Sequence, residues 1–127
     1  MLMQNVCITL GRLGVVCGPQ MGKKFGDFAR MWCMVMKDVR IDGEKVTAFQ
    51  GFVNMVNANP QVALSYPAEF SGAIASLCPP PPHLHQPLQL ILSGYKQTPS
   101  WPQTWRQLPQ DVQMILSHVY SGVEPAG

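Results

Sequence analysis

Charged side chains are scarce in this 127-residue sequence, at 13% of the residues against about 25% in an average soluble domain. The net charge of +2 is too small to indicate nucleic acid or an anionic membrane as a partner. Residues 21–45 hold ten of the charged side chains, whereas residues 46–95 hold only Glu69. Such a stretch is either packed on both sides or exposes apolar surface that another molecule covers.

Other absences narrow the function classes further. No apolar run is long enough for a membrane span, and the N-terminus lacks the basic region of a secretory signal. No G-x-G-x-x-G or phosphate loop is present, so no cofactor is expected. No C-x-x-C pair occurs, and the simplest interpretation is free thiols in a reducing compartment. The cysteines are Cys7, Cys17, Cys33 and Cys78.

Apolar residues recur with helical spacing, and no segment alternates with the period of a strand. In the first segment Val6, Leu10, Leu13 and Cys17 form the predicted inner stripe, and Gly18-Pro19 is expected to stop that helix. A second helix of about 18 residues should end near residues 38–41. Asp42 is then expected to cap a third helix.

The second half of the chain is rich in proline. A kink or a new helix start is expected at Pro67, and residues 79–82 are predicted to form a stiff extended linker. A fifth helix is predicted over residues 86–97, and residues 98–108 should be irregular. Pro109 should open a last helix, followed by a frayed tail over residues 123–127. The prediction is an all-α protein of about six helices.

The helix-stopping prolines recur with a period near 40 residues, at Pro19, Pro60 and Pro99. A glycine precedes each, at Gly11, Gly51 and Gly94, and a recurring helical glycine indicates close approach of a neighbouring helix. Two helices per 40 residues is the period of HEAT-type repeats, in which interior repeats bury two apolar faces. The alternative is an ordinary six-helix bundle.

Several positions in one register resemble the late HEAT repeats of the transportin family, which belongs to the importin-β group of nuclear import receptors. The resemblance covers residues 5–123. It is carried by Ile8–Gly14 with Cys17, by Phe28, Arg30 and Trp32-Cys33, by Glu44-Lys45, Ala48-Phe49, Gly51 and Asn59-Pro60, by Ile91-Leu92, Gly94 and Lys96, and by Tyr120–Val123.

The resemblance implies a fragment of a HEAT-repeat α-solenoid built from antiparallel helices. Its parts would be the second helix of a truncated repeat (1–19), a full repeat (20–60), a divergent repeat with the proline-rich linker at 79–82 (61–108), and a closing helix with a tail (109–127). The full-length receptor would bind cargo bearing a nuclear localisation signal, Ran GTPase and nucleoporins, in the cytoplasm and nucleus. The fragment alone would be incompetent for transport and would have no enzymatic activity.

The sequence offers few candidate sites. Trp101 and Trp105 lie in the irregular segment and are candidate protein-interaction anchors, with core packing as the alternative. His83 and His85 form a close pair, but an exposed polar linker is favoured over a metal site. Cys78 with a histidine lacks the other parts of a nucleophilic site.

Two further expectations concern surfaces. Gly18, Gly22 and Gly26 indicate close packing between helices, and the cations of residues 23–37 form a modest basic face. In a solenoid fragment, residues 3–17 lack a partner, which predicts an exposed apolar N-terminal face and self-association. The alternative function is an independent small helical scaffold that binds a partner helix or peptide along that face.

Overall fold

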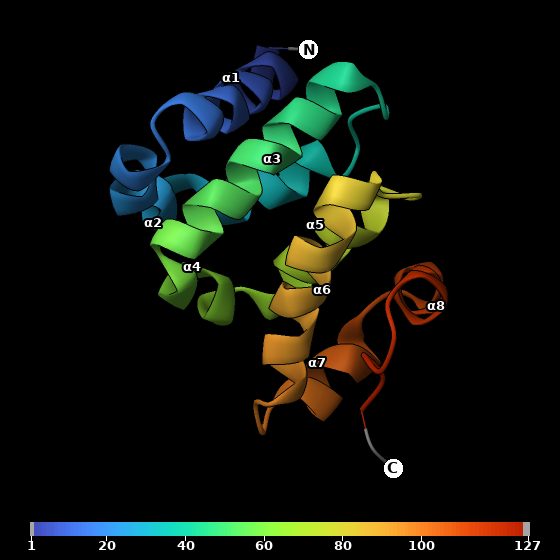
Figure 1. Ribbon diagram of the computed structural model, residues 1–127. Helices are drawn as coiled ribbons and strands as arrows, with labels where there is room; N and C mark the ends of the chain where they lie inside the picture. Colours follow the sequence, from blue (N-terminus) through green and yellow to red (C-terminus); the bar gives the residue numbers. More distant parts are fainter. Residues whose placement is uncertain (1, 126–127) are drawn as a thin grey trace.

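The chain is all-helical in the computed structural model, which describes residues 2–125 (Figure 1). Within that range the helices are α1 (Leu2–Val16), α2 (Gly18–Met36), α3 (Gly43–Ala58), α4 (Pro60–Ser65), α5 (Pro67–Ser76), α6 (Pro82–Lys96), α7 (Trp101–Gln107) and α8 (Gln110–Val119).

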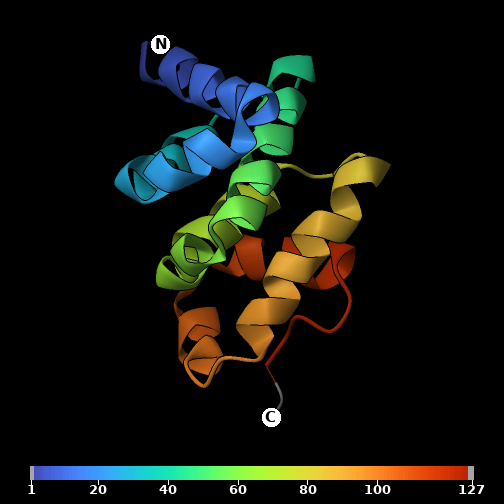
Figure 2. The ribbon, with the colours of Figure 1, turned by 60° about the vertical axis from the view of Figure 1, so that its left-hand side comes forward.

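Successive helices pack as a stack, and the ends of the chain lie at opposite ends of the molecule in both views (Figures 1 and 2). Helices α1 and α3 run in the same direction, because Gly11 lies opposite Ala48 and Gly14 lies opposite Gly51. Helix α2 runs the other way, since its Trp32 Nε1 donates a 2.8 Å hydrogen bond to the carbonyl of Cys7 in α1. Helix α5 packs on α2 in turn. The structure is thus a HEAT-repeat α-solenoid segment, as predicted.

Small residues allow the backbones of α1 and α3 to touch. A Cβ on Gly51 would stand 1.6 Å from the carbonyl oxygen of Gly11, and one on Gly14 would stand 2.6 Å from that of Gly51. The seam continues into α2, where a Cβ on Gly22 would meet the Ala58 side chain at 2.6 Å. The close approach predicted from glycine is confirmed here.

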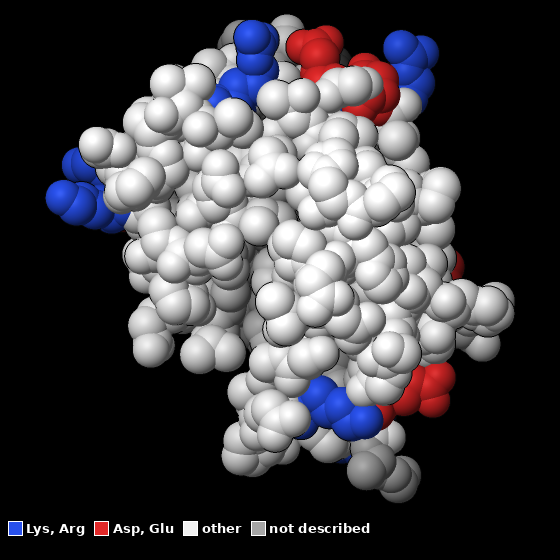
Figure 3. All heavy atoms as spheres, in the orientation of Figure 1, with Lys and Arg blue, Asp and Glu red and all other residues white. Residues whose placement is uncertain are grey.

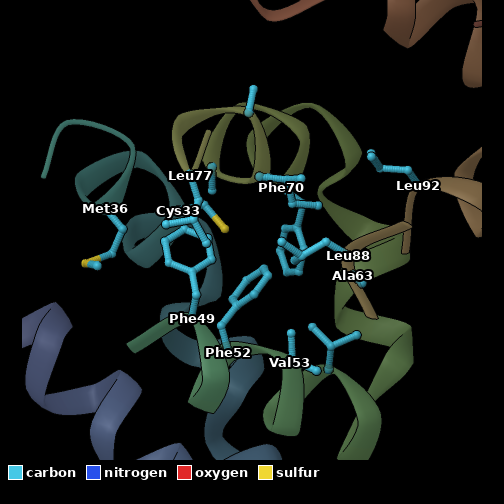
Figure 4. Close-up of a cluster of buried hydrophobic side chains, with 14 of the residues drawn as sticks. Cys33, Met36, Phe49, Phe52, Val53, Ala63, Phe70, Leu77, Leu88 and Leu92 are labelled. Carbon is cyan, nitrogen blue, oxygen red and sulfur yellow. The ribbon is translucent and has the colours of Figure 1, made fainter. Parts of the chain in front are cut away.

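An aromatic cluster forms the core between α2, α3 and α5 (Figure 4). Phe52 stacks on the Trp32 ring at 4.8 Å between centroids, and Phe25 contacts both Phe52 and Phe70 edge-on. Each of these four rings is fully buried. Burial of such side chains stabilises a fold by about 1.5–3 kcal/mol each, so this cluster holds the two helical layers together.

The C-terminal helices cover the other side of α5, where α7 and α8 both pack. The chain after α8 is fixed to α6, because the Gln89 side chain accepts a hydrogen bond from the Ser121 N–H and donates one to its carbonyl. Val123 is buried. The expectation of a frayed tail is therefore wrong at Val123, while residues 126 and 127 lie outside the described part.

Two helices more than the predicted six are present among the described residues. One comes from the new start at Pro67, which was predicted and which divides α4 from α5. The other is α7, which occupies the segment expected to be irregular, with Pro102 in its first turn. Proline is tolerated there because the first N–H groups of a helix need no partner within it.

Other helices also begin at or near prolines, at positions that differ from those predicted. Gly18-Pro19 begins α2 instead of merely ending α1, and Pro82 begins α6 instead of belonging wholly to a linker. Asp42 caps α3 as predicted, with Oδ1 accepting the Lys45 N–H at 2.9 Å. Pro109 is the N-cap of α8, one residue before its predicted place within the helix.

The apolar stripe predicted for the first helix is wrong at two of its four positions, although Leu10 packs against the core and Cys17 is half-buried. Val6 and Leu13 are each 40% exposed, whereas the buried side of α1 consists of Cys7, Gly11 and Gly14. Small residues occupy the side of α1 that faces α3, because α3 lies too close there for larger side chains.

Candidate functional site

An apolar groove lies between the end of α3 and α4 on one side and α6 on the other, with a volume of about 400 Å³. It is visible as a hollow in a face that carries almost no charge (Figure 3). Its lining includes no charged residue among those described. The lining residues are Val56, Asn57, Pro60, Ala63, Leu64, Gln86, Pro87, Leu90, Ile91, Gly94 and Tyr95.

The inner wall of this groove is held rigidly. Tyr95 is buried, its hydroxyl donates a 2.8 Å hydrogen bond to the Ala63 carbonyl, and its ring stacks on Trp101 at 5.6 Å. Burial, with smaller contributions from Cys33 and Glu69, raises the pKa of Tyr95 well above its ordinary value. The hydroxyl therefore remains a donor, and α6 stays fixed to α4.

The outward face of α1 is a second apolar surface. Leu2 and Val16 are 78% and 83% exposed, and Met3, Val6, Leu13 and Val15 are also exposed. No other described helix covers this side of α1, whose opposite side packs on α2 and α3 through Cys7, Gly11 and Gly14, with Ile8 and Leu10 partly buried beside them. The predicted exposed N-terminal face is therefore present in the structure.

The two tryptophans predicted as interaction anchors occupy different environments. Trp101 is buried and donates a 2.7 Å hydrogen bond from Nε1 to the Val123 carbonyl, which is the core packing named as its alternative. Trp105 is half-buried against Trp101, with ring centroids 5.8 Å apart. Of the pair, Trp105 alone presents part of its ring to solvent.

The histidine pair is divided by the fold. The His85 ring stacks on Tyr120, and its Nε2 lies 2.9 Å from the Val119 carbonyl, whereas His83 is exposed. Among residues 2–125 no three His, Cys, Asp or Glu side chains are grouped to hold a metal ion. The four cysteines are free; Cys7 and Cys33 are buried, and Cys17 and Cys78 are half-buried.

Lys45 is a buried cation that sequence reasoning missed. Its ammonium donates to the Val39 carbonyl at 2.7 Å and to the Ser76 carbonyl at 3.3 Å. Burial lowers the pKa of Lys45, and the nearby Asp38 and Asp42 oppose that change. The lysine thus joins the chain beyond α2, the start of α3 and the end of α5.

None of the described helices is both long and apolar enough to cross a membrane. No protein-family model matches the sequence. Individual relatives match nearly the whole chain. Transportin-1 of Mus musculus is 33% identical over 115 residues, covering 91% of this chain. Transportin of Dictyostelium discoideum is 30% identical over 121 residues, covering 94% of it.

The chain is homologous to a segment of the transportins. Importin subunit beta-2 of Schizosaccharomyces pombe agrees, with 33% identity over 115 residues and 90% of this chain. The match covers 13% of the length of the mouse and Dictyostelium transportins and 12% of the yeast protein. The resemblance drawn from the residues alone is confirmed.

The residues that match the transportins gave no indication of the groove. Leu64 and Leu90, which form its exposed edges, belong to no stripe or motif predicted from the sequence. The one signal was the scarcity of charge between residues 46 and 95, which predicted either two-sided packing or exposed apolar surface. The structure shows both, because α3 is buried while the edges of α4 and α6 are exposed.

Proposed function

We propose that the chain serves as a HEAT-repeat segment of a transportin-like nuclear import receptor and acts by binding proteins, not by catalysis. The observation that supports this most is the stacking of α1 on α3 in the same direction, with α2 packed on α5. Together with homology to transportins over about nine-tenths of the chain, that arrangement favours a slice of a longer stack.

The proposal includes a division into repeats. Residues 1–19 would be the second helix of one repeat, 20–60 a full repeat, 61–108 a divergent repeat, and 109–127 a closing helix with its tail. The division is supported by the pair α2 and α3, which begins at Gly18 and ends at Ala58, and by α8, which begins at Gln110. The outward apolar face of α1 would then receive the preceding repeat.

In the complete receptor we expect cargo bearing a nuclear localisation signal, Ran GTPase and nucleoporins as partners, with movement between cytoplasm and nucleus. We expect neither nucleic acid nor membrane as a partner, and no cofactor. Trp105 is kept as a candidate protein contact, because it is half-buried at the C-terminal end of the stack.

A chimeric receptor tests the proposal. The segment of mouse Transportin-1 that aligns with this chain is replaced by residues 5–123, and import of a fluorescent cargo is measured in permeabilised cells supplied with Ran and GTP. We expect nuclear accumulation close to that of the unmodified receptor. The matched control is the same chimera carrying Gly51→Leu, which prevents α1 from stacking on α3.

A chimera that folds, as judged by circular dichroism and gel filtration, but imports no cargo would contradict the proposal. A folded chimera with import retained in the Gly51→Leu control would show that the stacking of α1 is irrelevant to receptor function.

The outward face of α1 also favours a second candidate, a small scaffold that binds a partner helix. Under either function, the isolated chain should bind a hydrophobic dye or self-associate, and Val16→Gln should reduce both effects because Val16 is 83% exposed. A monodisperse monomer without dye binding would count against both. Import by the chimera separates them, because an unrelated scaffold would not replace a receptor segment.

A further inference from the structure

We propose that a cleft between α2, α5 and the start of α8 binds an acidic peptide segment that carries an apolar side chain between two carboxylates. The cleft lies on the side of the stack formed by α2, α5 and α8, where α5 packs on both other helices. Among the described residues it shares no lining with the groove between α4 and α6 or with the outward face of α1. The inference therefore goes beyond the function proposed above and does not depend on it.

Two cations line the cleft, Arg30 on α2 and Lys37 at the C-cap of that helix. Lys37 is exposed, and among residues 2–125 its ammonium takes part in no ion pair. The Arg30 Nε donates to Glu69 Oε2 at 3.1 Å, and within the same range its side chain makes no other hydrogen bond. The terminal nitrogens of the guanidinium are thus available to a second carboxylate, which they can bind with two hydrogen bonds. With two cations against the single anion of Glu69, the cleft favours an acidic occupant.

The spacing of the two cations determines the spacing of the carboxylates. Arg30 and Lys37 are separated by two turns of helix, which is about 10 Å along the axis. Met34 lies between them in the sequence, also lines the cleft and is 43% exposed. In an extended peptide, two residues three positions apart are likewise separated by about 10 Å. Acidic residues at the two ends of such a segment can therefore each face one cation, while an apolar residue between them contacts Met34.

The apolar part of the cleft leaves room for one side chain. Its volume of about 250 Å³ is below the range of roughly 300–1,000 Å³ that is typical of small-ligand sites, so it suits a single side chain better than a whole small molecule. Gly72 of α5 lines it, and a Cβ built on Gly72 would have nothing within 4 Å. Val112 of α8 lines it as well and is half-buried. An apolar side chain here would remove surface of Met34 and Val112 from water.

A capped hexapeptide of sequence Gly-Glu-Leu-Gly-Glu-Gly is the probe, and matched peptides carry Lys in place of both Glu residues or Ala in place of Leu. Each is titrated into the isotopically labelled full chain and followed by the amide NMR signals. We expect the Glu peptide to shift the signals of Met34, Gly72 and Val112 and to bind about tenfold more tightly than the Lys peptide. Raising the salt from about 0.01 M to about 0.15 M should weaken this binding, because the screening length falls from about 30 Å to about 8 Å. Equal affinity for the Glu and Lys peptides, or no shifts with the Glu peptide at millimolar concentration, would overturn the proposal.

Charge variants test which residues bind the carboxylates. Lys37→Met removes a cation and should weaken binding of the Glu peptide about threefold, a typical effect of one exposed ion pair. Glu69→Gln removes the competing anion and should strengthen binding about threefold, because the whole charge of Arg30 then faces the peptide. The matched control is Lys23→Met, which removes an exposed cation of α2 outside the cleft and should leave the affinity unchanged.

A pair of glycine variants tests the apolar part. Gly72→Leu fills the cleft and should abolish the tighter binding of the Leu peptide over the Ala peptide, whereas Gly94→Leu, which adds the same side chain to open space in the other groove, should preserve it. Equal effects of Lys37→Met and Lys23→Met, or weaker binding by Glu69→Gln, would overturn the proposal. Shifts confined to the outward face of α1 or to the groove between α4 and α6 would overturn it as well. Unaltered signals away from each substitution would show that the fold is intact.

Discussion

Replacing Gly51 with alanine should separate α1 from α3. The added Cβ would lie 1.6 Å from the Gly11 carbonyl oxygen, 2.7 Å from its carbonyl carbon and 3.1 Å from the Val15 nitrogen. These are backbone atoms of a helix, so no side chain can rotate to make room. The two helices must move apart by about 1.5–2 Å to restore ordinary contact, taking about 3.5 Å as the usual separation.

The expected cost follows from two opposing effects. Forcing an extra methyl group into packed surroundings costs about 1–3 kcal/mol, occasionally more, and contact with rigid backbone puts Gly51 at the upper end. Alanine favours a helix over glycine by about 1 kcal/mol. The net loss in free energy of unfolding should therefore be about 2 kcal/mol. Separation would also strain the hydrogen bond from Trp32 to the Cys7 carbonyl.

Urea denaturation measures the loss, and hydrogen exchange shows where it occurs. Amides of α1 should lose protection first, because α1 is held by this seam. The control is Gly94→Ala, a helical glycine with nothing within 4 Å of the added Cβ, which should gain about 1 kcal/mol. A Gly51→Ala protein as stable as the wild type, with α1 still protected, would refute the reasoning.

The remaining predictions concern buried polar groups and a helix cap. Lys45→Met leaves two carbonyl groups without their buried donor and should lower the free energy of unfolding by about 2 kcal/mol. Lys37→Met, at the exposed C-cap of α2, should change it little, and equal effects in urea denaturation would contradict the role of Lys45. Burial raises the pKa of both Cys33 and Tyr95, so the unfolded chain loses these protons first. Their contribution to stability is complete below the unfolded pKa of cysteine, about 8.5, and should fall as the pH rises toward about 11. Each such group lowers the free energy of unfolding by up to about 1.4 kcal/mol per pH unit above its unfolded pKa. Tyr95→Phe should therefore make the fall of this free energy with pH less steep above pH 10, and an unchanged slope would exclude Tyr95 as a cause of the fall. Asp42→Ala removes the side-chain acceptor at the start of α3 and should cost about 1 kcal/mol, measured by thermal unfolding; an unchanged midpoint would show that the cap is dispensable.

Local signals in the sequence were reliable where they act within a few residues. The Asp42 cap and the new helix start at Pro67 are present because each depends on backbone groups one turn away. Proline was harder to interpret, since Pro82 and Pro102 both sit in the first turns of helices that the sequence did not predict at those positions. A proline that ends one helix and a proline that opens the next look alike without the fold.

The glycines show where sequence reasoning fails. Gly11 and Gly51 take part in the predicted close contact, but Gly94, placed in the same series by its spacing, faces open space in the groove. The spacing of about 40 residues between the glycines identified the repeat, but it did not indicate the surroundings of Gly94. The groove was also missed, because its walls come from α4 and α6, which are separated by residues 66–81. No local pattern in the sequence shows that these two helices diverge in space.

The sequence by itself determined that the chain is helical, that its helices recur as a HEAT-type repeat and that its relatives are transportins, because periodicity, caps and matched residues are properties of short segments. Only the tertiary structure decided which faces are buried. On α1 the large residues Val6 and Leu13 point outward and the small ones inward, since backbone contact with α3 leaves no room for side chains. The sparse charge of residues 46–95 likewise became interpretable once the separation of α4 from α6 showed which apolar side chains remain exposed.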